Sequence, residues 1–236
     1  MKIKLFTVPN IITLCNLLCG CGSIVASLMF CNFRLALILI IASAVCDFFD
    51  GFTARLLRQY SDIGVQLDSL ADMVSFGVAP SAMMYLFASQ TFTIFTLPET
   101  IVNILVFVPF LMAAFSALRL AKFNIDDSQH DSFEGLPTPA NAIFCASFVY
   151  AIVTDVRAVE LEWIVLISVI MSVLLVSPVR MFSFKLKNLS WNANKLQYIF
   201  LALSLVALLT LGLYSVPTII VIYIVLSTIS WLFCKK

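Results

Sequence analysis

The sequence predicts an all-α protein, a polytopic bundle of transmembrane helices with about eight spans and with both termini in the cytoplasm. The first observation is composition, because 62% of the 236 residues are hydrophobic and only 11% are charged. A soluble domain cannot bury that much apolar surface, whereas lipid can cover it. The second observation is that apolar runs of about 20 residues, the length of a bilayer span, recur along the chain. A net charge of +1 gives no basis for nucleic-acid binding.

The apolar runs define the candidate spans, which are separated by polar or proline-containing stretches. We expect spans at residues 14–32, 35–54, 65–89, 101–121, 138–155, 161–179, 196–213 and 216–234. The basic start "MKIKLFTVPNIIT" is interpreted as a retained interfacial segment, because no convincing small-residue cleavage site follows it. Pro80 lies inside the third candidate span and predicts a kink there. No internal repeat is evident, so residues 1–236 are expected to form a single membrane domain.

The distribution of Lys and Arg, which are 14 in all, predicts the orientation of the spans. If the N-terminus is cytoplasmic, the outer loops hold only Arg34 and Arg157. Cytoplasmic loops of membrane proteins are enriched in these residues, so the asymmetry supports a cytoplasmic N-terminus. An even number of spans then returns the final "KK" to the same side. The inner segments hold Lys2, Lys4, Arg55, Arg58, Arg119, Lys122, Arg180, Lys185, Lys187, Lys195, Lys235 and Lys236.

Acidic residues are concentrated in the stretch "CDFFDGFTARLLRQYSDIGVQLDSLAD" at residues 46–72. At the inner end of the second span, Asp47, Asp50, Gly51 and Ala54 are spaced so that a helix presents them on one face. The inner start of the third span repeats this arrangement with Gly64, Asp68 and Asp72. The short connection 56–63 predicts that the two helices are antiparallel neighbours. Their carboxylates are therefore expected to converge just inside the cytoplasmic surface of the bilayer.

Four carboxylates cannot all remain charged together in a low dielectric, so either most are protonated or cations neutralise them. Oxygen ligands on rigid helices suit hard divalent ions such as Mg²⁺ or Mn²⁺. Two such ions form a clamp for phosphoryl chemistry. Gly51, Ala54 and Gly64 lack bulk and would let a diphosphate approach the backbone, while Arg55 offers a bidentate phosphate donor. Two other interpretations stay open: solvated residues at packed helix ends, or a cation or proton pathway.

These residues match the signature D-x2-D-G-x2-A-R-x8-G-x3-D-x3-D, and the chain resembles the CDP-alcohol phosphotransferases. Within this family it is similar to the integral-membrane phosphatidylserine synthases. That narrower likeness rests on "PNIITLCNLLCG" (9–20), "SFGVAP" (75–80), "RLAKFN" (119–124) and "FEGLPTPANA" (133–142). The likeness favours a catalytic core at residues 1–155, with additional spans of unassigned role at 156–236. The residues at the fixed positions of the signature are Asp47, Asp50, Gly51, Ala54, Arg55, Gly64, Asp68 and Asp72.

The resemblance implies transfer of a phosphatidyl group from CDP-diacylglycerol to L-serine, with CMP released, by a multi-pass enzyme of the cell membrane whose active site faces the cytoplasm. It also implies a homodimer. Asp47, Asp50 and Asp68 would hold Mg²⁺ or Mn²⁺, in two sites, and Asp72 would complete the metal site and act as the general base. Residues implied to contact CDP-diacylglycerol are Gly51, Ala54, Arg55, Ser61 and Gly64, with Asn10, Thr13 and Asn16 lining the nucleotide pocket or, alternatively, acting as interfacial caps.

The acceptor site is predicted less directly. Arg119 and Lys122, with help from Asn124, are candidates to bind the serine carboxylate, although both cations could instead contact lipid phosphate. Thr138 is expected to cap the next helix. Asp126, Asp127, His130, Asp131 and Glu134 are interpreted as solvated loop residues. The alternatives are a family enzyme with another acceptor (glycerol 3-phosphate, an inositol phosphate or choline) and, more remotely, a small cation-coupled transporter.

Overall fold

The structure is a computed structural model that describes residues 5–125, 133–182 and 194–234. Within these residues the chain is almost entirely helical, as predicted. In chain order the elements are α1 (Val8–Leu28), α2 (Phe33–Leu56), α3 (Asp62–Asp72), the π-helical turn η1 (Met73–Val78), α4 (Ala79–Ser89), α5 (Glu99–Phe107), α6 (Phe110–Ile125), β1 (Phe133–Glu134), α7 (Thr138–Thr154), α8 (Leu161–Val176), β2 (Arg180–Met181), α9 (Lys195–Thr210), the 3₁₀ turn η2 (Gly212–Tyr214) and α10 (Ser215–Cys234).

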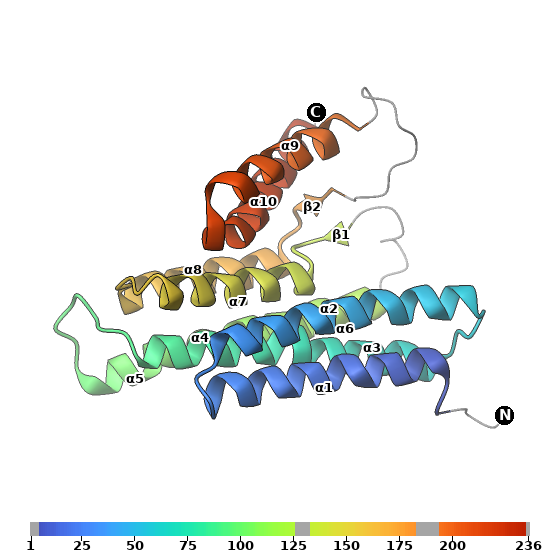
Figure 1. Ribbon diagram of the computed structural model, residues 1–236, viewed down its shortest axis with the longest axis horizontal. Coiled ribbons are helices and arrows are strands. Elements are labelled where there is room, and N and C mark those ends of the chain that lie inside the picture. Colours follow the sequence, from blue (N-terminus) through green and yellow to red (C-terminus); the bar gives the residue numbers. More distant parts are fainter. Residues whose placement is uncertain (1–4, 126–132, 183–193, 235–236) are drawn as a thin grey trace.

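The helices form three tiers. An elongated layer contains α1 to α6, the pair α7 and α8 lies on this layer, and the α9–α10 hairpin crosses the pair at an angle (Figure 1). β1 and β2 form one short antiparallel ladder that pairs Glu134 with Arg180, where the segment before α7 meets the segment after α8. The hairpin is joined to the rest mainly through α10, which packs against α7 and β2.

All eight predicted apolar segments are helical. Five helical stretches in the described residues are long and apolar enough to cross a membrane: 8–28, 33–56, 62–89, 99–125 and 212–233. Three others, 138–154, 161–176 and 195–210, are also apolar but shorter. The protein is therefore an all-α, membrane-type helix bundle. The count of eight spans remains a prediction.

The first helix begins earlier than predicted. Residues 8–13 were expected to be an interfacial segment, yet α1 starts at Val8. Thr7 provides the N-cap, since its side-chain oxygen accepts a hydrogen bond from the backbone N–H of Asn10 (3.4 Å), and Pro9 occupies the first turn, where its missing N–H costs nothing. The polar residues that suggested a late start are buried inside the bundle. They therefore line the interior and do not mark a helix end.

The third apolar segment is one continuous helical stretch, 62–89, with η1 in its middle. Pro80 is the second residue after η1, and the position of this turn fits the inability of proline to donate a backbone hydrogen bond and the steric demand of its ring. Ser81 Oγ donates to the carbonyl oxygen of Gly77 (2.7 Å) beside it. The predicted irregularity at Pro80 thus takes the form of a π-helical turn.

The expectation that α2 and α3 are neighbours holds through their side chains, since carboxylates from both helices meet. α2 and α3 are joined by a short connection, but they make only marginal backbone contact, because each packs on α1 instead. The apolar core lies further along, where α2, η1, α4 and α6 meet around the fully buried side chains Ile40, Phe76, Met83, Met84 and Met112. α1 is therefore the common support that holds the two acidic helices at a distance which their side chains can bridge.

Candidate active site

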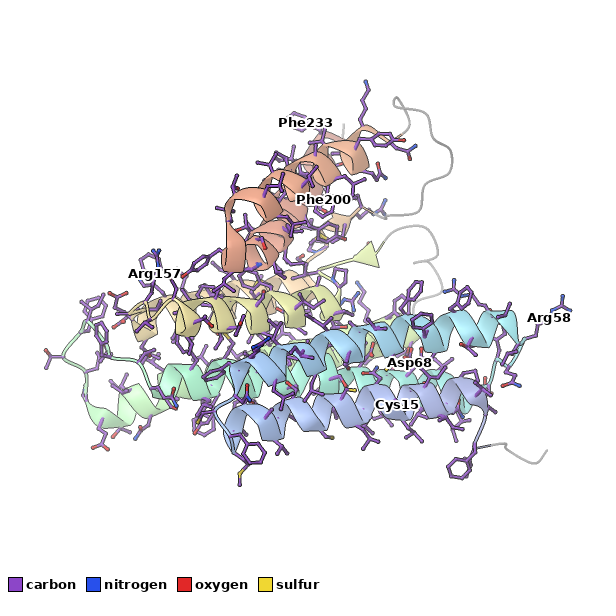
Figure 2. All side chains as sticks on the ribbon, in the orientation of Figure 1. Cys15, Arg58, Asp68, Arg157, Phe200 and Phe233 are labelled. Carbon is purple, nitrogen blue, oxygen red and sulfur yellow. The ribbon has the colours of Figure 1, made fainter. Side chains whose placement is uncertain are left out.

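The carboxylates of α2 and α3 converge as predicted. Asp47 and Asp50 from α2 and Asp68 from α3 each place an oxygen within 4.8 Å of the others. Asp50 is buried, and the other two side chains are half-buried. Figure 2 shows Asp68 within the elongated layer, in the half that ends at Arg58. We call these three residues the aspartate triad.

The triad has the chemical features of a site for a hard cation. Asp68 Oδ1 is buried and accepts no hydrogen bond from any described residue. The ion pairs formed among the described side chains do not involve the triad. A buried carboxylate oxygen without a partner carries a large desolvation cost, and a divalent cation bound by several carboxylates removes it. The residues present therefore fit Mg²⁺ or Mn²⁺.

Two side chains of α1 hold carboxylates in place. Thr13 Oγ1 donates to Asp50 Oδ2 at 2.6 Å, and Asn16 Nδ2 donates to Asp72 Oδ1 at 3.0 Å. Both donors are buried and lie in the interior of α1, so they do not act as helix caps. Asp72 is also buried, with 8% of its surface exposed, but it does not belong to the close triad. Asp72 thus lies beside the triad, close enough for its charge to interact with those of all three triad carboxylates, and it has an amide partner of its own.

Asn16 is itself fixed from two further elements. Ser75 Oγ, in η1, donates to the Asn16 backbone carbonyl at 3.0 Å. Ser43 Oγ, in α2, donates to the Asn16 side-chain oxygen. Because these groups are fully buried, each needs its partner, and the network locks the amide in the orientation that presents its N–H to Asp72.

The residues predicted to contact a diphosphate lie near the end of α2 and at the start of α3, and we call this region the diphosphate corner. A side chain at Gly51 would meet nothing within 4 Å, so space adjoins the backbone there. Arg55 is exposed, and its Nε donates to the Gly51 carbonyl at 3.0 Å. Ser61 is the N-cap of α3, where its Oγ accepts from the Gly64 N–H at 3.1 Å. A Cβ at Gly64 would lie 3.0 Å from that Oγ and 3.2 Å from Asn10 Oδ1, so this corner is close-packed.

The candidate acceptor residues lie beside a cavity of about 250 Å³ at the C-terminal end of α6. Arg119 and Lys122 both line it, as does Glu134. Arg119 Nη1 donates to Thr138 Oγ1 at 3.4 Å, and Lys122 Nζ pairs with Glu134 Oε2 at 3.0 Å. Asn124 does not line this cavity, since its amide donates to Ser69 Oγ at 2.8 Å and ties α6 to α3.

Two expectations for this region were wrong. Glu134 was interpreted as a solvated loop residue, but it lies in β1 with 30% of its side chain exposed and is ion-paired. Thr138 was expected to cap α7, but Pro137 occupies the cap position and the Thr138 hydroxyl faces Arg119. Asp126, Asp127, His130 and Asp131 lie outside the described residues.

Comparison with known proteins decides the family. Residues 6–176, more than half of the chain, match the model of the CDP-alcohol phosphatidyltransferase family. The chain belongs to this family. The matched range contains the triad, Asp72, the diphosphate corner and every residue of the acceptor cavity named above, whereas α9 and α10 lie beyond it.

Relatives of this chain carry a more specific name. A CDP-diacylglycerol–serine O-phosphatidyltransferase of Helicobacter pylori is 33% identical over 237 residues, covering 97% of this chain and 92% of the relative. One from Bacillus subtilis is 41% identical over 132 residues, covering 56% of this chain and 69% of the relative. One from Methanocaldococcus jannaschii is 32% identical over 145 residues, covering 61% of each chain. The family predicted from the signature is confirmed.

Sequence reasoning missed some residues that support the candidate site. Ser43 and Ser75 support Asn16, and neither was singled out. A signal was present, because both are polar residues inside apolar spans, and Ser75 opens the segment "SFGVAP". A lone serine in a span usually bonds to its own helix, so the sequence alone could not separate these two from the others.

Proposed function

We propose that this protein transfers the phosphatidyl group of CDP-diacylglycerol to the hydroxyl of L-serine, giving phosphatidylserine and CMP. The observation that most supports this proposal is the aspartate triad, which is built from the family's signature residues and in which Asp68 Oδ1 accepts no hydrogen bond from a described residue. The names of the relatives support serine as the acceptor over glycerol 3-phosphate, an inositol phosphate or choline. Family membership favours an enzyme over the transporter alternative.

Asp47, Asp50 and Asp68 would hold Mg²⁺ or Mn²⁺, and we propose two ions with Asp72 completing the site. When bound, such ions stabilise negative charge on a diphosphate and on the departing CMP phosphate. Thr13 supports this role by fixing the orientation of Asp50. A hydrogen bond behind a ligand raises metal affinity by keeping the ligand in its bound geometry.

Recognition of CDP-diacylglycerol is assigned to the corner formed by the end of α2 and the start of α3. The open space at Gly51 admits a diphosphate to the helix backbone, Ala54 adds no bulk, and exposed Arg55 offers a charge-assisted donor. Ser61 and Gly64 shape the other side. Of the α1 residues predicted to line the nucleotide pocket, Asn10 borders Gly64 directly. Thr13 and Asn16 serve the pocket through the carboxylates they hold.

The transfer is a single displacement at phosphorus. The serine hydroxyl oxygen forms a bond to the lipid-side phosphorus, and the bond from that phosphorus to the oxygen bridging to CMP breaks. The electron pair of the broken bond leaves on the CMP phosphate. Asp72 accepts the proton of the hydroxyl, and Asn16 keeps the carboxylate oriented for that step. A serine hydroxyl is a poor nucleophile at neutral pH, which is why a positioned base is required.

The acceptor is assigned to the cavity beside α6. Arg119 and Lys122 would bind the serine carboxylate, and the hydroxyl would face the aspartates. Asn124 contributes indirectly, because its bond to Ser69 fixes α6 against the helix that carries Asp68 and Asp72.

The proposal includes a multi-pass topology in the cell membrane with eight spans, cytoplasmic termini and an active site that faces the cytoplasm. Arg58, at one end of the elongated layer, and Arg157, between α7 and α8, are predicted to lie on opposite sides of the membrane, and they lie toward opposite ends of the long axis of the molecule (Figure 2). The aspartates lie toward the Arg58 end, the predicted cytoplasmic side. The family resemblance also favours a homodimer, which crosslinking in membranes would test.

The test is incubation of the purified protein with CDP-diacylglycerol, Mn²⁺ or Mg²⁺, and labelled acceptors. We expect labelled phosphatidylserine from serine, release of an equal amount of CMP, and loss of both products when a chelator removes the metal. Transfer to glycerol 3-phosphate but not to serine would overturn the assignment of the acceptor. Turnover that survives complete metal removal would overturn the role of the triad.

A further inference from the structure

Glu134 is held in a fixed position by the backbone around it. Its neighbour Gly135 has φ +77°, a conformation that side chains disfavour, and donates its N–H to the Val179 carbonyl at 2.9 Å. The next N–H, from Leu136, bonds to the Leu174 carbonyl at 2.9 Å. Together with the β1–β2 pairing, these bonds fasten the segment to the end of α8. The Glu134 carboxylate is therefore delivered to the wall of the acceptor cavity by a rigid support.

The charges around this cavity form a specific pattern. Arg119 and Lys122 supply two positive charges and Glu134 supplies one negative charge, while Leu175, Val176 and other apolar side chains make up much of the remaining wall. Arg119 Nε is buried and donates to no described residue, so its N–H lacks a hydrogen-bond acceptor among them. A ligand that brings a carboxylate to this position satisfies Arg119. Its own positive group would then find Glu134 in the same cavity.

The cavity also lies close to the chemistry. α6 packs against η1 and α3, and Arg119 is near enough to Asp72 for their charges to attract. Lys122 occupies one oxygen of Glu134, Oε2. A carboxylate has about four lone-pair sites, so Glu134 retains capacity for a second cationic donor. A volume of about 250 Å³ suits an amino acid and is small for a nucleotide.

We propose that Glu134 is a specificity-determining residue that binds the α-ammonium of the amino-acid acceptor, while Arg119 and Lys122 bind its carboxylate. The inference rests on the proposed transfer to serine and deepens it. A zwitterion matches the charge pattern at both ends. A phosphorylated acceptor brings two negative charges and no positive one, so Glu134 repels it. This explains how a cavity with two basic residues would select an amino acid over glycerol 3-phosphate.

The experiment compares serine with glycerate, which has a hydroxyl group in place of the ammonium. Glu134→Gln keeps the size of the side chain and removes its charge. We expect the KM for serine to rise about 10- to 100-fold with little change in kcat, since a uniform binding contact is lost. The ratio of kcat/KM for serine to that for glycerate should fall by a similar factor. Glu134→Asp should recover part of the ratio. Glu99→Gln, a charge removal in the first turn of α5, is the matched control and should leave it unchanged.

Repeating the comparison in the Lys122→Gln variant separates recognition of the ammonium group from a purely structural role, in which Glu134 only holds Lys122 in place. In Lys122→Gln the ion pair with Glu134 is absent, so a purely structural role as the partner of Lys122 predicts no further loss from adding Glu134→Gln. Ammonium recognition predicts that the serine-to-glycerate ratio falls again in the double variant. An unchanged ratio in both backgrounds overturns the inference while serine transfer by the parent protein still stands. Failure of the parent protein to use serine at all is a different result and overturns the proposed function itself.

Discussion

The helices α1 to α4 and the α9–α10 hairpin bury their polar groups in opposite ways. In α1 to α4 the buried polar residues include ionisable ones, Asp50 and Asp72, each with a hydrogen-bonding partner on α1. In the described part of α9 and α10 the buried polar side chains are serines and one tyrosine, and none is acidic or basic. A carboxylate inside a membrane protein carries a large desolvation cost, so such a residue is usually retained for a function. The contrast supports the proposal that the chemistry takes place in the first region.

The hairpin is instead attached by aromatic packing. Tyr223 of α10 lies with its ring centroid 4.9 Å from that of Phe182 and 6.1 Å from that of Phe200 in α9. Phe182 and Phe200 are themselves 5.8 Å apart, edge to face. Such clusters stabilise by burial and ring geometry. The family match ends at residue 176, before this hairpin begins. The first region is therefore expected to control turnover, and the second to control stability.

The strongest test of this division is Asp72→Asn. We expect turnover to fall about 10³-fold or more, because the asparagine cannot accept the serine proton. Binding of CDP-diacylglycerol in the presence of Mn²⁺ should be largely retained, since the triad is intact. The measurements are initial rates of phosphatidylserine formation and a direct lipid-binding assay. Asp62→Asn, an exposed carboxylate in the first turn of α3, serves as the control. Normal turnover by Asp72→Asn would remove its assigned role.

Phe200→Ala should produce the reverse result. Phe200 is 8% exposed and completes the aromatic cluster, so its removal leaves a cavity that costs about 3 kcal/mol. We expect a lower thermal midpoint in detergent, with KM values for both substrates unchanged below the transition. Leu209→Ala, at a position on α9 that is 79% exposed, should have little effect and controls for loss of apolar bulk. A large rise in either KM would show that the hairpin takes part in the active site.

In the first region, the sequence predicted the clustered carboxylates better than the residues that hydrogen-bond to them. Asp47, Asp50 and Asp68 were placed together correctly, because helical periodicity and a short connection restrict where those side chains can go. The contacts of Thr13 and Asn16 with the carboxylates were not foreseen. They join residues far apart in the chain, and periodicity within one helix says nothing about which partner a polar face will meet.

Glu134 illustrates the same limit from the other direction. In the sequence it belongs to a run of acidic residues between two spans, and such runs are usually solvated. Its place in the cavity follows from the pairing of β1 with β2 and from the backbone bond of Gly135 to Val179. Strands of two residues have no detectable alternation, so this pairing leaves no pattern in the sequence. The start of α1 was missed for a related reason, since polar residues in a span were interpreted as a boundary.

A smaller effect is expected from Thr13→Val, which keeps the shape of the side chain but cannot donate to Asp50. The concentration of Mn²⁺ required for half-maximal activity should rise about 10- to 100-fold, because an outer hydrogen bond orients a metal ligand. Titration of metal-dependent thermal stabilisation gives a second measurement that does not depend on turnover. Ser27→Ala is the control, since Ser27 is buried in the same helix and its hydroxyl donates to backbone carbonyls of that helix, those of Ser23 and Ile24. Equal metal requirements in both variants would contradict the assigned support.

The smallest effect concerns the joint between α7 and the hairpin. Asp155, at the end of α7, accepts hydrogen bonds from Arg157 Nε (2.5 Å) and from the Tyr214 hydroxyl (2.9 Å) in η2. These bonds, the one from Arg157 first, hold the pKa of Asp155 below its ordinary value of 3.8. A carboxylate with a lowered pKa in the folded state stabilises the fold above its unfolded pKa and loses that contribution as the pH falls through the folded value.

Asp155→Asn should therefore lower the thermal midpoint at pH 7 by about 2 °C or less, because the group is exposed and its ion pair is screened. The difference from the parent protein should shrink as the pH falls below 3.8, the ordinary pKa of this carboxyl, and as salt is added. Turnover at pH 7 should not change, since the joint lies beside Arg157 in the α7–α8 pair, away from the half of the elongated layer that holds Asp68 (Figure 2). A loss of turnover without a loss of stability would mean that the hairpin and the catalytic helices are coupled through this joint, and the division between the two regions would fail.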